Sequence, residues 1–200
     1  MTAILKVDTI QDTSGNNIIN ENADTITIGA SGDTIALAGT TVTGITQGIT
    51  QADEWRLSAN LSNNGTNTIT ANWERNDTNF SYIGNGMTES SGIFTFPQTG
   101  IYNIFIRGIT YADNAVAYSG LYLQQTTDNS TYTTRVYAFG GNASSVGYYA
   151  GFSGSAIFDV TNTSNVKAKF GFAGANASSG AYGSTTDTQT GANFIRLGDT

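Results

Sequence analysis

The stretch GIFTFPQTGIYNIFIRGIT, residues 92–110, decides the fold class of this chain. Residues 93–96 combine aromatic and β-branched side chains, which favour a strand, and Pro97–Gly100 supply a tight turn. The strand that follows, Ile101–Ile106, is apolar on both of its faces. Successive side chains of a strand point to opposite sides. We therefore expect a second sheet to bury one face and another subunit to bury the other.

The chain beyond residue 54 continues this pattern of strands and turns. It holds all 22 aromatic residues, and Gly, Asn and Ser separate the runs that favour strands. Besides 93–96 and 101–110, strands are predicted at 55–57, 69–73, 117–125, 132–139, 147–160, 166–172 and 193–197. Eight or nine strands in about 150 residues predict an all-β domain of two packed antiparallel sheets over residues 51–200, a jelly roll or a related sandwich.

The first 50 residues carry a different pattern, in which the phrase Asp-Thr-Ile recurs at 8–10, 24–26 and 33–35. Ordering this segment costs more backbone entropy than burial of its 14 larger aliphatic side chains returns. It cannot form a core alone. We therefore expect residues 1–50 to be a short β-repeat stalk, intertwined in a trimer. The alternative is a flexible arm rich in Thr, Gly and Asn.

The composition argues against several classes of function. The chain has no cysteine and no histidine, only 12% charged residues and a net charge of −7. Thiol chemistry and a histidine base are excluded, and the eight scattered basic residues make no phosphate-binding stripe. No apolar run is long enough to span a membrane. We expect no cofactor, no metal, no nucleic-acid partner and no membrane insertion.

The carboxylates do not form a clear catalytic pair. A glycan hydrolase needs two carboxyl groups about 5–10 Å apart across a cleft. Asp53 and Glu54 point to opposite sides of an extended chain, and Glu74 and Asp77 lie near a turn, where surface charges are expected. We therefore expect no catalytic residues, and an enzyme acting on polysaccharide is the least favoured alternative.

Residues 92–104 resemble a signature of the trimeric globular heads of complement and tumour-necrosis-factor type. That family carries Phe, five residues, Gly, one residue and Tyr, which match Phe94, Gly100 and Tyr102, whereas Ile104 and Ile106 replace aromatics. Residues 193–197 are similar to that family's last strand, which is buried in the trimer centre. The resemblance implies a homotrimeric jelly roll over residues 53–200.

The amino-terminal phrase ILKVDTIQDTSGNN, residues 4–17, continues into 26–35 and resembles the start of tail-fibre and related virion proteins of bacteriophages, especially marine ones. In those proteins the amino-terminal part is attached to the virion and the distal domain faces the host. The resemblance implies a location on the virion surface, where residues 1–20 bind another virion protein.

The position of a binding surface follows from counting strands. Successive antiparallel strands run up and down, so alternate loops share one end of the sandwich. We assume that the last strand runs back toward the stalk, because domain termini often lie close together. The far-end loops are then 111–116, 140–146 and 174–190, and the stalk-side connections are 97–100, 126–130 and 161–164.

The far-end loops are rich in Tyr, Ser, Gly and Asn, the composition of adaptable recognition surfaces. Tyr182 is the only aromatic residue of the loop 174–190, so we expect it to be exposed and to stack on a sugar ring. The pair Tyr148–Tyr149 is expected to divide between core and surface. The candidate receptor-binding residues are Tyr111, Asp113, Asn114, Asn142, Ser144, Asn176, Ser178 and Tyr182.

Together these observations predict a homotrimeric virion fibre protein, whose head attaches to a host surface glycan or protein through its distal loops. Three copies on one fibre add avidity. A decoration or head-fibre protein of the capsid is the alternative, since the same architecture suits it.

Overall fold

A computed structural model of the chain describes residues 48–62, 67–78, 80–112, 114, 116–142, 148–175 and 178–200, with the backbone alone for Asn142 and Tyr148. Contacts within the chain group Thr46–Thr200 as one unit. The stalk predicted for residues 1–50 falls almost wholly outside the described residues. It stays a prediction, as does the domain boundary at residue 50.

The described residues form fourteen strands and no helix, which confirms the all-β class. The strands are β1 (Ala52–Leu57), β2 (Leu61–Ser62), β3 (Asn67–Thr68), β4 (Trp73–Arg75), β5 (Tyr82–Ile83), β6 (Thr88–Ser90), β7 (Ile93–Thr95), β8 (Gly100–Ala112), β9 (Val116–Thr126), β10 (Thr133–Asn142), β11 (Tyr148–Val160), β12 (Lys167–Gly174), β13 (Ser179–Ala181) and β14 (Gly191–Gly198).

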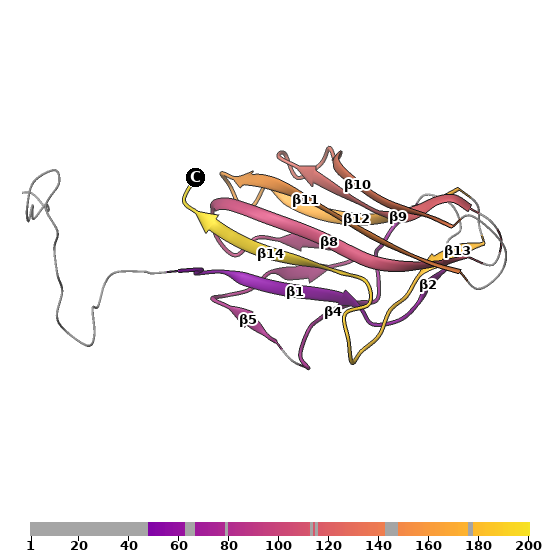
Figure 1. The fold of residues 1–200 in the computed structure, drawn as a ribbon. Coiled ribbons are helices and arrows are strands. Elements are labelled where there is room, and N and C mark those ends of the chain that lie inside the picture. The colour runs from indigo at the N-terminus through magenta and orange to yellow at the C-terminus, as the bar shows by residue number, and fades with distance from the viewer. Residues whose placement is uncertain are drawn as a thin grey trace, which may run out of the picture. The chain divides into compact units, whose positions relative to one another are not determined.

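Two antiparallel sheets pack face to face (Figure 1). The first sheet has the order β2-β13-β8-β14-β1-β4, with β11 paired to β8 and β5 paired to β1. The second has the order β10-β9-β12-β7-β6, with β3 paired to β12. The neighbours in each sheet come from distant parts of the sequence, as in a jelly roll. The predicted sandwich is thereby confirmed.

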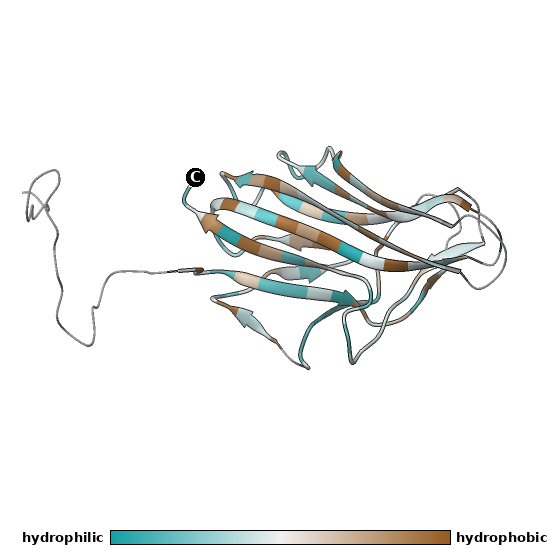
Figure 2. Cartoon of the chain, in the orientation of Figure 1, coloured by the Kyte–Doolittle hydropathy of each residue, from teal (hydrophilic) through white to brown (hydrophobic). Residues whose placement is uncertain are grey.

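Strand β8, which contains residues 101–110, has partner strands along both of its edges. It pairs along its whole length with β11, from Gly100 opposite Val160 to Ala112 opposite Tyr148, and its other edge pairs with β14 and β13. Side chains alternate along it, so that residues 102, 104 and 106 are buried in the core. Hydrophobic and hydrophilic residues accordingly follow one another in short bands along β8 and β14 (Figure 2).

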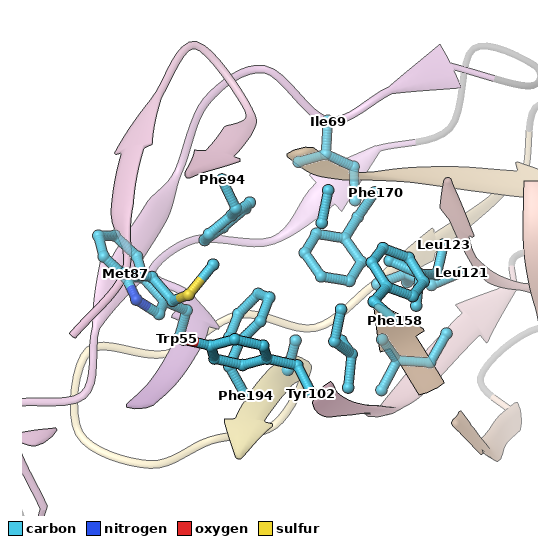
Figure 3. Packing of buried hydrophobic residues seen from close by; sticks show 14 of the residues in the cluster. Trp55, Ile69, Met87, Phe94, Tyr102, Leu121, Leu123, Phe158, Phe170 and Phe194 are labelled. Carbon is cyan, nitrogen blue, oxygen red and sulfur yellow. The ribbon is translucent and has the colours of Figure 1, made fainter. Parts of the chain in front are cut away.

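Aromatic rings fill the space between the sheets (Figure 3). Phe94 lies at their centre, with ring centroids 5.2 Å from Phe170, 5.3 Å from Phe194 and 5.4 Å from Trp55. Most of these contacts are edge-to-face, the geometry that aromatic quadrupoles favour. Because these rings come from both sheets, the concentration of aromatics beyond residue 54 is what allows this part of the chain to form its own core.

The two ends of the sandwich carry different parts of the chain. Ala52 at the start of β1 lies opposite Ile195 near the end of β14, so the unit begins and ends at one end. Ala112 at the end of β8 pairs with Tyr148 and Ser179 at the other end. Figure 1 shows β13 at that far end. The carboxy-terminal ends of β8, β10 and β12 therefore share the far end, as the strand count predicts.

Two local predictions are wrong. Residues 69–73 do not form one strand, because Asn72 has φ +65° and turns the backbone, so that β4 begins only at Trp73. Ile69 is instead buried, and its amide donates a hydrogen bond to the carbonyl of Phe170. The segment 174–190 is not a plain loop, since its residues Ser179–Ala181 form β13 between β8 and β2.

Asp77 is a surface charge, as the sequence predicts, with 74% of its side chain exposed, whereas Glu74 is partly buried. Both bind Arg56, whose side chain is only 1% exposed: Glu74 Oε2 lies 2.9 Å from Nε and Asp77 Oδ1 lies 2.8 Å from Nη2. The guanidinium also donates to Thr78 Oγ1 at 3.2 Å and to the carbonyl of Thr185. Arg56 thus fastens two loops to β1.

Candidate functional site

Three tyrosines gather at the far end of the first sheet, on the face turned away from the core. Tyr111 of β8 and Tyr149 of β11 lie opposite each other in the ladder, and Tyr182 directly follows β13. The Tyr182 ring centroid lies 4.9 Å from that of Tyr111 and 5.4 Å from that of Tyr149. We call these three residues the tyrosine cluster. Tyr182 is therefore half-buried among other rings, and not the isolated exposed aromatic that the sequence predicted.

Strands and a close glycine contact hold the tyrosine cluster in place. The amide of Tyr182 donates to the carbonyl of Ile109 at 3.0 Å, and the hydroxyl of Tyr111 donates to the carbonyl of Leu61 at 3.3 Å. A Cβ on Gly180 would lie 2.4 Å from the ring of Tyr111, so the ring packs flat on bare backbone. Rings supported in this way are preorganised for binding.

A hollow of about 410 Å³ opens beside the cluster. It is lined by Ile109, Tyr149, Tyr182, Asp187 and Gln189. Hydrogen bonds from the side chains of Ser184 and Gln189 lower the pKa of Asp187 below its ordinary value of 3.8, so this carboxylate is ionised at neutral pH. Apolar walls with a few polar groups are typical of small-ligand sites.

The candidate residues from the sequence have different outcomes. The structure brings Tyr111 and Tyr182 together, and it joins Asn114 to Ser178 by a hydrogen bond of 3.0 Å between the amide and the hydroxyl oxygen. The remaining candidates, Asp113, Ser144, Asn176 and the side chain of Asn142, lie outside the described residues.

Sequence reasoning missed Tyr149, Asp187 and Gln189 as site residues. Tyr149 is 65% exposed, which agrees with the expectation that the Tyr148–Tyr149 pair divides between core and surface, although the side chain of Tyr148 is not described. Strand alternation was the signal that one tyrosine faces outward. Its pairing with Tyr111 depends on the register of β11 on β8, which local sequence does not specify.

The half of the same sheet face nearer the start of β1 carries four apolar side chains around Asn103. Ile101 and Phe105 on β8, Ile157 on β11 and Ile195 on β14 lie there, and we call these four the apolar face. Ile157 and Ile195 flank Asn103 in the ladder, and Ile157 is exposed. The second face of β8 is thus not covered by the described part of its own chain, as the sequence led us to expect.

A polar band separates the apolar face from the tyrosine cluster. Arg107 of β8 pairs with Glu54 of β1, with Nη2 2.9 Å from Oε1, and its Nη1 donates to Asn193 Oδ1 at 2.8 Å. The hydroxyl of Thr188 donates to the same Glu54 oxygen at 2.6 Å. This band ties β8, β14 and β1 to the segment that leads into the hollow.

Structural ion pairs occupy the carboxylates at the start of β1. Asp53 lies on the opposite side of the strand from Glu54 and binds Arg75, with Nε 3.1 Å from Oδ1. It also accepts the amide of Met87 and the indole of Trp55. Among the described residues, no group of three or more acidic side chains could hold a metal ion, and no helix is long and apolar enough to cross a membrane.

Comparison with known proteins identifies the fold. No protein-family model matches the chain, and no curated protein matches it. Among solved structures, murine APRIL at pH 5.0 superimposes with a TM-score of 0.53 and 14% identity, covering 74% of this chain and 98% of that one. Eiger TNF from S. frugiperda gives a TM-score of 0.51 and 12% identity, covering 74% and 93%.

These likenesses establish the class of domain. The described head is a jelly roll of the tumour-necrosis-factor type, which confirms for the fold the resemblance of residues 92–104. At such low identity the likeness extends to the fold alone. The resemblance of residues 4–17 to bacteriophage fibre proteins lies outside the described residues and stays a prediction.

Proposed function

We propose that the chain is the homotrimeric head of a bacteriophage virion fibre, which binds a receptor on the host surface without catalysis. The observation that carries this proposal is the apolar face on a jelly roll of the tumour-necrosis-factor type. Apolar side chains that gather on one face of a sheet and are not covered by their own chain are typical of a protein interface. The apolar face surrounds Asn103 on three neighbouring strands, β11, β8 and β14.

A second copy of the chain is the partner that best fits the apolar face. Most homo-oligomers have closed cyclic symmetry, and a sheet face that packs against a different surface of its neighbour closes into a ring. The resemblance of residues 92–104 to trimeric heads favours a three-fold ring. A trimer also accounts for durability outside a cell in a chain that has no disulfides.

The far end is the part that we expect to contact the receptor. It carries the tyrosine cluster and the Asn114–Ser178 contact, and Tyr with small polar residues is the usual chemistry of adaptable recognition. Three copies on one axis convert modest single-site affinity into avidity. The virion location rests on the amino-terminal resemblance, and residues 1–20 are the proposed attachment to another virion protein.

The test has two parts. Light scattering on the purified full chain should return three times the chain mass of 21.0 kDa. Antibodies against the head, used to label virus particles for electron microscopy, should mark the fibre tips. A monomer in the first measurement contradicts the trimer. Labelling spread over the capsid supports the decoration role and contradicts attachment through a fibre.

A further inference from the structure

The hollow beside the tyrosine cluster continues into a second hollow of about 550 Å³. Ile109 and Gln189 line both, so the two hollows adjoin on the outer face of the sheet, and we call them together the groove. The second hollow reaches Phe139, on β10 of the other sheet, where the edges of the two sheets meet. The groove therefore crosses from the first sheet to the second.

We propose that this groove binds a short, uncharged oligosaccharide, which makes the receptor of the proposed head a glycan rather than a protein. The inference rests on the proposed attachment function and names its ligand class. Four features support the proposal. They are the aromatic rings at both ends of the groove, the open space above Gly151 between these rings, the polar side chains that line the groove, and the negative charge around it.

Aromatic rings stand at the two ends of the groove. Tyr149 and Tyr182 form one end, and Phe139 forms the other. A pyranose ring has a face of C–H groups that packs on the electron-rich face of an aromatic ring. Two aromatic sites at different points along the groove can each stack on a different sugar unit, so they suit an oligosaccharide better than a single small ligand.

The floor between the rings is open because Gly151 has no side chain. Gly151 lies opposite Ile109 in the β11–β8 ladder, and a Cβ added there would meet no atom within 4 Å. Its backbone is not in the left-handed region, so no conformational requirement for glycine applies. A ligand could therefore lie across Gly151, whereas a large side chain at this position would block the groove.

Polar groups line the groove on both sides of β8. The carboxylate of Asp187 is an acceptor, and its lowered pKa keeps it in that state. Gln189 adds an amide, and Ser153 adds an exposed hydroxyl on β11. Vicinal sugar hydroxyls both donate and accept, and a carboxylate next to an amide satisfies both roles.

The charges select an uncharged ligand. Arg107 is the one cation among the described lining residues, and its two terminal nitrogens already bind Glu54 and Asn193. Asp187 adds a negative charge, and the whole chain carries −7. Acidic saccharides would meet this negative field without a free counter-charge. The apolar face lies beyond the Arg107–Glu54 pair, and the proposal requires that self-association through it leaves the groove open.

An array of immobilised saccharides, neutral and acidic, tests the proposal with the full chain and its variants. The unaltered chain should bind neutral oligosaccharides and not sialylated ones. Tyr149→Ala should weaken binding about tenfold or more, the usual effect of losing a stacking ring. Tyr82→Ala is the matched control, since Tyr82 is also an exposed tyrosine on a strand, β5, but does not line the groove.

A second pair of variants tests the passage itself. Gly151→Trp should abolish binding by filling the groove, whereas Gly151→Ala should retain it within about threefold, because a methyl group has room there. Light scattering on each variant shows whether the oligomer persists. Loss of binding in a variant that keeps its oligomer supports the groove.

Three outcomes would overturn the inference: binding to no neutral saccharide, a preference for acidic saccharides, or full binding by Gly151→Trp. Loss of the oligomer in Gly151→Trp would also overturn it, by assigning the groove to the contact between copies. The proposed attachment function is tested separately, by adsorption to host cells. If Gly151→Trp trimers still adsorb to host cells, attachment stands while the glycan groove does not.

Discussion

Arg56 shows how one side chain can organise two loops. An arginine that is 1% exposed needs partners for its whole guanidinium, and it finds them in two carboxylates, a hydroxyl and a carbonyl. Arginine suits this position better than lysine because its planar fork reaches several acceptors at once. The loop 74–78 and the segment at Thr185 are thereby fixed to β1.

Replacing this arginine should therefore cost stability. For Arg56→Met we expect the free energy of unfolding to fall by about 2–3 kcal/mol, because several hydrogen bonds are lost while the partner carboxylates regain water. Urea unfolding followed by tryptophan fluorescence measures it. Arg107→Ala is the comparison: its side chain is 38% exposed, so its loss should cost less than about 1 kcal/mol. Equal losses would refute the special role of Arg56.

Asp128 supplies a pH-dependent prediction. Its carboxylate accepts the amides of Thr131 and Ser130 and the hydroxyl of Thr126, which hold its pKa far below the ordinary value of 3.8. A depressed pKa in the folded state means that the stabilisation is present above the unfolded-state pKa and is lost as pH falls through the folded value. Asp128→Asn should therefore unfold at a lower urea concentration than the native chain at about pH 6, and the gap should narrow at about pH 2.5. A gap that widened in acid would refute this account.

Single residues also show where sequence reasoning stops. Residue type and spacing predicted correctly that Tyr111 and Tyr182 lie at the same end of the domain, and that Asp53 and Glu54 face opposite ways. Apart from Trp55 with Asp53, the partners of these residues come from positions 22 to 134 residues away, as for Asp53 with Arg75 and Glu54 with Thr188. The register of the sheets decides which residues so far apart in the sequence become neighbours, and local sequence does not specify it. For this reason Tyr182 was predicted to be exposed to water, whereas its ring packs against those of Tyr111 and Tyr149.

Among elements, β9 and β10 approach unusually closely at a glycine. Gly120 lies opposite Phe139, and a Cβ on Gly120 would come within 2.0 Å of the carbonyl oxygen of Ala138. That oxygen belongs to the backbone, so the strand itself would have to move. The exposed rings of Tyr118 and Phe139, 5.1 Å apart, pack beside this glycine.

We therefore expect Gly120→Ala to lower the free energy of unfolding by about 2–3 kcal/mol through overpacking. Gly151→Ala, also on a strand but with open space at its Cβ, should change it by less than about 1 kcal/mol. Urea unfolding of the two variants side by side provides the comparison. Similar values for both would mean that the strands can separate without cost.

Strands were predictable where their side chains alternate and their ends carry turn residues. Residues 101–110 of β8 and 193–197 of β14 were located from sequence, within a few residues of their bounds. Residues 69–73 were predicted wrongly, because Asn72 has a left-handed backbone and an asparagine in the sequence does not by itself reveal this conformation. Strand β13 has three residues, too few to alternate visibly, and it exists because β8 and β2 bind it from either side.

For the whole molecule, the apolar face predicts how stability depends on assembly. An aspartate at position 157 would place a charge in the proposed contact between copies and weaken association at least about 100-fold. Light scattering should then find the chain mass for Ile157→Asp and three times that mass for the native chain. Thermal unfolding of the native chain should shift to higher temperature with concentration, and that of the variant should not.

The control for this variant lies on the other sheet. Ile93 of β7 is an exposed isoleucine away from the apolar face, so Ile93→Asp should leave the oligomer intact. Dissociation of both variants would mean that the trimer uses the second sheet as well. An intact Ile157→Asp oligomer would refute the apolar face as the site of contact.

The pairing of Ala52 with Ile195 has a practical meaning for engineering. A reporter enzyme or fluorescent protein joined after Thr200 would be attached close to the first residues of β1, a full sandwich length from the tyrosines. Such fusions should leave ligand recognition undisturbed. Segments at the far end could then be exchanged to test the proposed recognition, while the end that carries Ala52 and Ile195 is kept constant.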